Sequence, residues 1–187
     1  MKRQTKALGL MGLAALPMIA GSIISATAQS AHAKPPAPRR GKVVMTVLKA
    51  KALSKFDPKI PFTKRHRPDF YLMTKVSTKK GYQRSGKHKN KKVAHFNHKI
   101  VSRLPKTRLM VYTIRLLDSD RLVRDDVADI NPERGKRTLT VYYEPKTGYV
   151  FGSKGRRLGK HGQKFTIKGD SRQHRASITF RIDRKRS

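Results

Sequence analysis

The sequence predicts an all-β protein folded as an antiparallel eight-stranded β-sandwich. From Gly41 onward, apolar and polar residues alternate with a period of two in several segments, which is the periodicity of strands with one buried side. Turn sequences such as EPKTG at residues 144–148 separate these segments. No segment has the pattern of a long amphipathic helix, so the sequence predicts short antiparallel strands joined by turns.

Five segments alternate clearly and form the predicted centre of the sandwich: residues 43–47, 70–76, 109–117, 139–143 and 176–182. In the last of these, every second side chain is apolar, which predicts one buried and one solvent-facing side. Weaker strand candidates are residues 92–96, 98–102, 149–151 and 165–168. Two glycine- and lysine-rich stretches are predicted to be mobile loops, residues 78–92 and 152–164.

The first 33 residues have the form of a secretory signal peptide. A positive head (MKRQTK) precedes an apolar run (ALGLMGLAALPMIAGSII), and SATAQSAHA then offers Ala-x-Ala cleavage sites. We therefore expect export to the periplasm or the cell exterior, with an uncleaved membrane anchor as the alternative. Residues 34–40 (KPPAPRR) predict a proline-stiffened linker. Residues 41–187 are predicted to form one domain, without disulfides because the chain has no cysteine.

The chain is strongly basic, with 45 Lys+Arg against 11 Asp+Glu and a formal net charge of +34. A field of this size selects anionic partners. For an exported protein, these are anionic lipids, envelope polyanions and, secondarily, released nucleic acid. No G-x-S-x-G motif, cysteine nucleophile or phosphate-binding glycine loop is present, so we expect a binding protein and not an enzyme.

The few acidic residues are concentrated in one stretch, residues 116–130 (LLDSDRLVRDDVADI). Asp118 and Asp120 lie two apart at the end of a predicted strand and can point to the same side, while Asp125 or Asp126 returns on the far limb of a short loop. Carboxylates this close raise one another's pKa unless a positive charge lies between them. A hard divalent cation or the abundant lysines and arginines could supply that charge.

The order of these motifs resembles that of C2 domains, the calcium-dependent lipid-binding β-sandwiches. Residues 41–53 (GKVVMTVLKAKAL) lead to Asp57, PDFY at residues 68–71 opens the next strand, and the D-S-D motif at residues 118–120 is followed by Asp126. The resemblance runs from Gly41 to the last strand and implies the circular permutation found in phospholipases. It also implies five calcium ligands: Asp57, Asp69, Asp118, Asp120 and Asp126.

The first acidic loop departs from the C2 pattern. It is longer than usual, and its insertion carries Lys59, Lys64, Arg65, His66 and Arg67. These cations could neutralise the carboxylates directly. The alternative to a working calcium site is therefore a vestigial site held by internal salt bridges, in a module that binds other proteins.

The resemblance also implies attachment to membranes. Apolar side chains at the loop tips would enter the lipid interface: Ile60, Phe62, Leu122 and Val123. Lysines of a neighbouring loop would contact anionic headgroups: Lys87, Lys89, Lys91 and Lys92. The predicted function is a secreted or periplasmic module that binds anionic membrane or envelope surfaces with Ca²⁺. The alternative is calcium-independent binding of a polyanion or nucleic acid.

Overall fold

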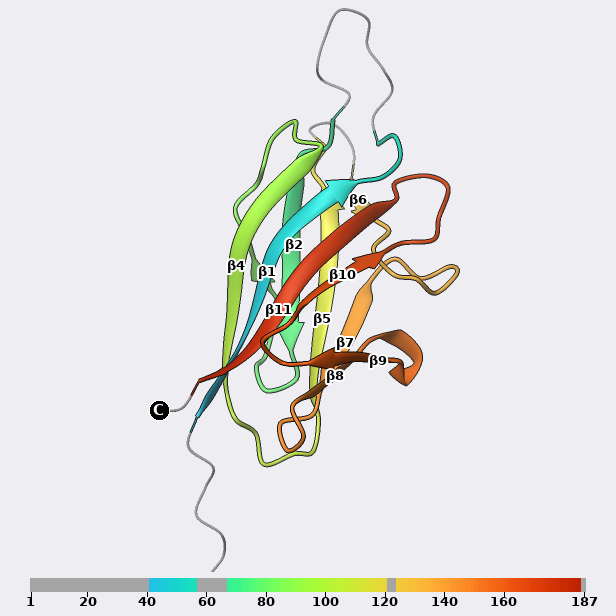
Figure 1. Cartoon of the computed structure of the whole chain (residues 1–187). Helices are drawn as coiled ribbons and strands as arrows, with labels where there is room; N and C mark the ends of the chain where they lie inside the picture. The colour runs from blue at the N-terminus through green and yellow to red at the C-terminus, as the bar shows by residue number, and fades with distance from the viewer. Residues whose placement is uncertain (1–40, 57–66, 121–123, 186–187) are drawn as a thin grey trace, which may run out of the picture. The chain divides into compact units, whose positions relative to one another are not determined.

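The computed structural model describes residues 41–56, 67–120 and 124–185. These residues form a sandwich of two antiparallel β-sheets, with one short 3-10 turn, η1 (Ser153–Gly155) (Figure 1). The predicted signal peptide (residues 1–33) and linker (residues 34–40) lie outside the described residues. So do five predicted site residues: Asp57, Ile60, Phe62, Leu122 and Val123. Within the described ranges, no helix has the length and apolar character needed to cross a membrane.

The first sheet has four strands in the order β10-β11-β1-β4. They are β1 (Lys42–Ala52), β4 (Val93–Arg103), β10 (Lys164–Lys168) and β11 (Ala176–Lys185). Met45 of β1 lies opposite Ile182 of β11 and Ile100 of β4, and all three side chains are buried. Residues directly opposite in an antiparallel pair share a face, so this register turns the apolar set of all three strands inward.

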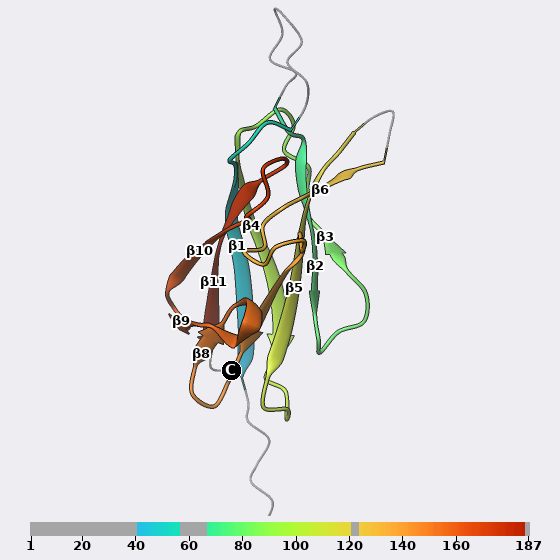
Figure 2. The ribbon, with the colours of Figure 1, turned by 90° about the vertical axis from the view of Figure 1, so that its right-hand side faces the viewer.

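The second sheet has seven strands, in the order β3-β2-β5-β7-β8-β9 with β6 paired to β5. Its strands are β2 (Phe70–Val76), β3 (Gln83–Arg84), β5 (Met110–Asp118), β6 (Asp126–Ala128), β7 (Leu139–Tyr143), β8 (Tyr149–Phe151) and β9 (Arg157–Lys160). Figure 2 shows β1, β10 and β11 of the first sheet in one layer and β2, β3 and β5 of the second sheet in another. The core between them is the main source of stability in this cysteine-free chain.

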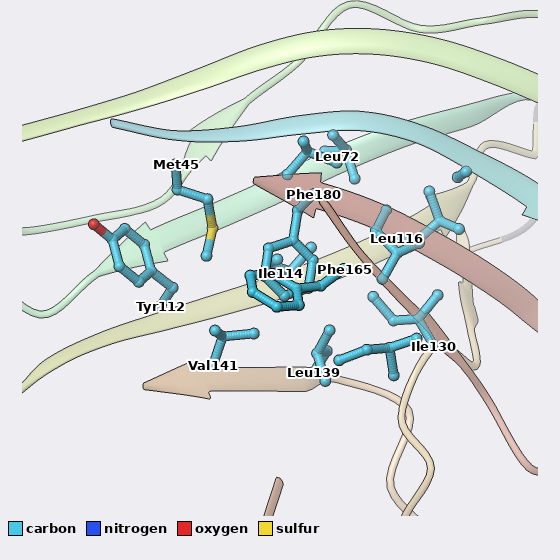
Figure 3. Close-up of a cluster of buried hydrophobic side chains, with 14 of the residues drawn as sticks. Met45, Leu72, Tyr112, Ile114, Leu116, Ile130, Leu139, Val141, Phe165 and Phe180 are labelled. Atoms are coloured by element: carbon cyan, nitrogen blue, oxygen red, sulfur yellow. The ribbon is translucent and has the colours of Figure 1, made fainter. Parts of the chain in front are cut away.

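The core consists of inward-facing side chains from both layers (Figure 3). Met45 and Phe180 come from the first sheet, and Leu72, Ile114 and Leu116 from the second, and all five are fully buried. Burial of one such side chain stabilises the fold by roughly 1.5–3 kcal/mol. The alternation recognised in the sequence therefore selects the residues that hold the two sheets together.

Every predicted strand segment overlaps a strand, with Lys92 and Leu109 falling one residue before β4 and β5, but the described residues form eleven strands and not eight. The candidates at residues 92–96 and 98–102 are one strand, β4, whose pairing with β1 shifts between Val47 and Lys49. Asn97 has a positive φ of 47° at this irregularity, which breaks the alternation. The predicted loops contain β3 and β9, because strands of two to four residues are too short to show a period.

Candidate functional site

The β5–β6 hairpin places two carboxylates face to face. Asp118 ends β5, Asp126 begins β6, and the two residues lie directly opposite each other. On the other side of β5, Asp118 pairs with Phe70 at the start of β2. The backbone N–H of Asp69 donates to Asp118 Oδ1 at 2.6 Å, and the N–H of Ser119 donates to the carbonyl oxygen of Asp69 at 3.1 Å. The two predicted acidic loops therefore meet at one end of the sandwich, which we term the acidic end.

Asp125 closes the loop that carries Asp120. The backbone N–H of Asp120 donates to Asp125 Oδ1 at 3.2 Å, and the hydroxyl of Tyr71 donates to Asp125 Oδ2 at 2.5 Å. Burial and the Asp125 carboxylate raise the pKa of the Tyr71 hydroxyl, which keeps it a donor. Asp125 is thus a loop-shaping residue on the far limb, whereas Asp126 has half of its side chain exposed (51%).

The negative charges at the acidic end act on one another. Burial raises the pKa of the Asp120 carboxyl, and the carboxylates of Asp126, Asp125 and Asp69 raise it further. His174, in the loop between β10 and β11, lowers the pKa of the same carboxyl. Neighbouring carboxylates disfavour the charged form of a carboxyl, and a cation placed among these carboxylates stabilises that charged form.

Among the described residues, few positively charged side chains lie close enough to pair with the carboxylates of the acidic end. His174 Nδ1 lies 3.5 Å from Asp126 Oδ2, and its ring stacks on Phe56 with centroids 5.4 Å apart. Across residues 41–56, 67–120 and 124–185, no lysine or arginine forms an ion pair with Asp69, Asp120, Asp125 or Asp126. Lys87 instead donates to Ser119 Oγ at 3.2 Å. Lys59, Lys64 and Arg65, three of the cations that could close the site, lie outside the described residues, so the alternative of a site closed by lysines and arginines stays a prediction.

The donor chemistry of the acidic end suits a hard cation such as calcium, because carboxylate oxygens are its preferred ligands. Among the described residues, however, no three histidine, aspartate or glutamate side chains are grouped as a metal site. Oxygens of Asp69, Asp118 and Asp125 already accept hydrogen bonds. The predicted ligands Asp69, Asp118, Asp120 and Asp126 thus gather at one end, and the carboxylates of Asp69 and Asp118 each keep further lone pairs beside the one that accepts a hydrogen bond.

Asp129, which also lies in the acidic stretch, has a structural role. Its side chain is 1% exposed. Asp129 Oδ1 accepts from the N–H of Asn131 at 3.0 Å, and Oδ2 accepts from the N–H groups of Asp170 at 2.9 Å and Ser171 at 2.7 Å. A Cβ on Gly169 would overlap the Asp129 carboxylate. Asp129 therefore fastens the β10–β11 loop, which carries His174, to the acidic end.

The predicted lysine-rich loop lies against the acidic end. The side chains of Lys87, Lys89, Lys91 and Lys92 are exposed. The backbone N–H of Asn90 donates to Asp69 Oδ1 at 2.7 Å, and that of Lys91 donates to the carbonyl oxygen of Pro68 at 3.0 Å. The loop thus presents positive charge beside the carboxylates while its backbone shapes the loop of Asp69.

Sequence reasoning missed His174. The residue pattern alone left Asp125 and Asp126 open, and the resemblance to C2 domains selected Asp126. Asp125 was visible as a candidate because it lies in the acidic stretch. Its hydrogen bond with Tyr71 could not be predicted, because the two residues are 54 apart in the sequence. His174 carried no signal in the sequence, since only the β10–β11 loop brings it to Asp126. His95 and His98 lie three apart on β4 and face opposite ways, because His95 lies opposite the exposed Lys49 and His98 lies opposite the buried Val47.

Solved C2 domains share this fold. A C2 domain of plant extended synaptotagmin 1 superposes with a TM-score of 0.53 at 12% identity, covering 80% of this chain and 98% of that one. A C2 domain protein from Ramazzottius varieornatus gives a TM-score of 0.52 at 13% identity, covering 79% of this chain and 89% of that one. A calcium-bound structure of two C2 domains of extended synaptotagmin 2 gives 0.50 at 12% identity. That alignment covers 78% of this chain and 46% of the two-domain chain.

No family model matches the sequence, and no curated protein matches it either. At these low identities, the structural likeness establishes the fold. The protein is an all-β sandwich of the C2 type.

Proposed function

We propose that the protein is an exported, non-enzymatic module that attaches to anionic membrane or envelope surfaces through its acidic end, with calcium between protein and surface. The observation that carries this proposal is the meeting of two acidic loops, in which the N–H of Asp69 donates to Asp118 Oδ1 at 2.6 Å. The structure of extended synaptotagmin 2 with the same fold is calcium bound. Export rests on the signal-peptide form of the first 33 residues.

The residues that would hold calcium are Asp69, Asp118, Asp120 and Asp126, together with Asp57, which lies outside the described residues. Calcium would supply positive charge shared between these carboxylates and the phosphate oxygens of the bound surface. Around it, the chain contributes two features of its own. Burial and then the neighbouring carboxylates raise the pKa of the Asp120 carboxyl, so a nearby cation would stabilise its charged form. Asp125 accepts the backbone N–H of Asp120.

The lysine-rich loop supplies a second, salt-sensitive attraction beside the acidic end. Near an anionic surface, each lysine contributes roughly 1 kcal/mol, and salt screens this term beyond about 8 Å at physiological ionic strength. Lys87, Lys89, Lys91 and Lys92 are all exposed on this loop. Their positive charge also offsets repulsion between the carboxylates and an anionic surface.

Vesicle co-sedimentation tests the proposal. The purified protein is mixed with phosphatidylserine-containing vesicles, or with phosphatidylcholine vesicles, in calcium or in chelator. We expect calcium to increase sedimentation with phosphatidylserine, and Asp118→Asn with Asp120→Asn to abolish that increase. Glu133→Gln is the matched control, because Glu133 pairs with Lys136 away from the cluster. Binding that is equal in calcium and chelator, and unchanged by the double substitution, overturns the proposal.

A further inference from the structure

The outer face of the four-stranded sheet is strongly basic. Strand register shows which residues share it, because directly opposite residues of an antiparallel pair point to the same side. Thr46 of β1 lies opposite Arg181 of β11 and Lys99 of β4, and Arg181 lies opposite Lys164 of β10. One row across all four strands thus carries three cations facing away from the core.

The same register extends this pattern along the whole sheet. The outward-facing basic side chains of the four strands are Lys42, Lys49, Lys51, Lys99, Arg103, Lys164, Lys168, Arg181 and Lys185. The outward positions of the paired residues contain one carboxylate, Asp183, which forms an ion pair with Arg181 at 2.8 Å. We term this surface the basic face.

Short side chains lie between the long cationic ones. Val44, Thr46, Ser177 and Thr179 face outward on β1 and β11, yet each is 6–8% exposed. Lysine and arginine stems of neighbouring strands cover short residues of this kind while their charged ends stay in water. On the two central strands of the basic face, β1 and β11, short side chains therefore lie among the cations.

We propose that the basic face binds a linear polyanion with repeated phosphate groups, independently of calcium. Charge complementarity carries the proposal, because nine cations and one paired carboxylate line a single sheet face. From Lys42 to Lys51 the face extends about 30 Å, at roughly 3.3 Å per strand residue. No phenylalanine or tyrosine occupies its outward paired positions, so recognition rests on phosphate and not on base stacking.

A polymer fits this surface better than a bilayer does. The exposed apolar side chains of β4 are Val93 and Val101, 37% and 41% exposed. Both are shorter than the lysines and arginines around them, so they do not reach the interior of a lipid layer. The proposed membrane contact is the acidic end of the sandwich, whereas the basic face is the broad side of one sheet (Figure 1).

Long-chain inorganic polyphosphate is the probe for the test. Binding is measured by fluorescence polarisation in chelator over a range of salt concentrations. The face variant carries K49Q, K51Q, K164Q and K168Q, and the loop variant carries K87Q, K89Q, K91Q and K92Q, which removes the same charge from exposed positions. We expect the face variant to bind at least tenfold more weakly, with a salt slope smaller by about 3. The loop variant should keep most of the affinity.

Equal losses in the two variants overturn the proposal, since they show attraction to net charge alone. Wild-type affinity in the face variant overturns it as well. The proposal is also overturned if, in chelator, the face variant no longer binds phosphatidylserine vesicles but still binds polyphosphate. That result would assign the basic face to membranes. Acetylation footprinting of the wild-type protein gives a result without any substitution. Polyphosphate should protect Lys49, Lys51, Lys164 and Lys168, and protection confined to residues 87–92 contradicts the proposal.

Discussion

Asp118 lies directly opposite Asp126 where β5 and β6 pair, so strand pairing itself holds two like charges together. Like charges directly opposite in an antiparallel pair destabilise it. Asp118 is buried, and the N–H of Asp69, which donates to its Oδ1 at 2.6 Å, offsets part of this cost. The fold thus concentrates negative charge at one end of an otherwise basic protein, an arrangement that a bound cation would stabilise.

Asp120→Asn should stabilise the protein in the absence of divalent cations. The pKa of Asp120 is raised in the folded state, first by burial and then by Asp126. A carboxyl with a raised pKa in the folded state lowers the stability of the protein when it is charged. This loss of stability begins as pH rises past the unfolded pKa of about 3.9, and it is complete above the folded pKa. Because the site is near the surface, we expect a rise in Tm of about 1–2 °C at pH 7.

Thermal melts in chelator at pH 7 and pH 3 check this prediction. At pH 3 the carboxyl is largely protonated in both states, so the substituted and wild-type proteins should melt alike. A lower Tm for Asp120→Asn at pH 7 would mean that the carboxylate has a stabilising partner.

The Tyr71–Asp125 hydrogen bond should stabilise the acidic loop. The Tyr71 hydroxyl donates to Asp125 Oδ2 at 2.5 Å, and hydrogen bonds to charged groups contribute about 1.5–3 kcal/mol. We expect Tyr71→Phe to lower the free energy of unfolding by about 1–2 kcal/mol in urea titrations. In a double-mutant cycle with Asp125→Ala, the two effects should not add. Additive losses would show that the two side chains do not interact.

Asp129→Ala should be the most destabilising change at the acidic end. It leaves three backbone N–H groups, of Asn131, Asp170 and Ser171, without their carboxylate acceptor. We expect a loss of about 3–5 kcal/mol in the free energy of unfolding. Gly169→Ala should also destabilise the fold, by about 1–3 kcal/mol, because the new Cβ would overlap Asp129.

Urea denaturation of both variants is the measurement, with Asp126→Asn as the control. Asp126 is half exposed (51%), so its substitution should change stability by at most about 0.5 kcal/mol in chelator. Equal stability of Asp129→Ala and the control would contradict the structural role of Asp129.

The sandwich could be predicted because its long strands are half-buried. Along β11, Ile178 and Phe180 face the core while Thr179 and Arg181 face outward, and this difference appears in the sequence as alternation. The β-sandwich could therefore be inferred from the alternation, and the candidate site from the spacing of Asp69, Asp118, Asp120 and Asp126 along the sequence. The short strands β3, β6 and β9 depend on neighbours far along the chain and have too few residues for a period.

The register between strands could not be predicted, and it determines the surfaces. Lys99 and Arg181 become neighbours of Thr46 only because β4 and β11 pair with opposite sides of β1. Similarly, the β10–β11 loop brings His174 to Asp126 across 48 residues of sequence. Composition alone gave the size of the positive charge, whereas its concentration on one sheet face follows from pairing.

The melting temperature as a function of calcium concentration tests the central claim most directly. A bound ion stabilises the folded state by RT ln(1 + [L]/Kd), about 2.7 kcal/mol at a hundredfold excess over Kd, or a rise of about 5–10 °C. We expect this rise for the wild-type protein, a smaller one with magnesium, and none when Asp118→Asn and Asp120→Asn are combined. A wild-type protein that melts at the same temperature in calcium and in chelator would contradict the calcium site.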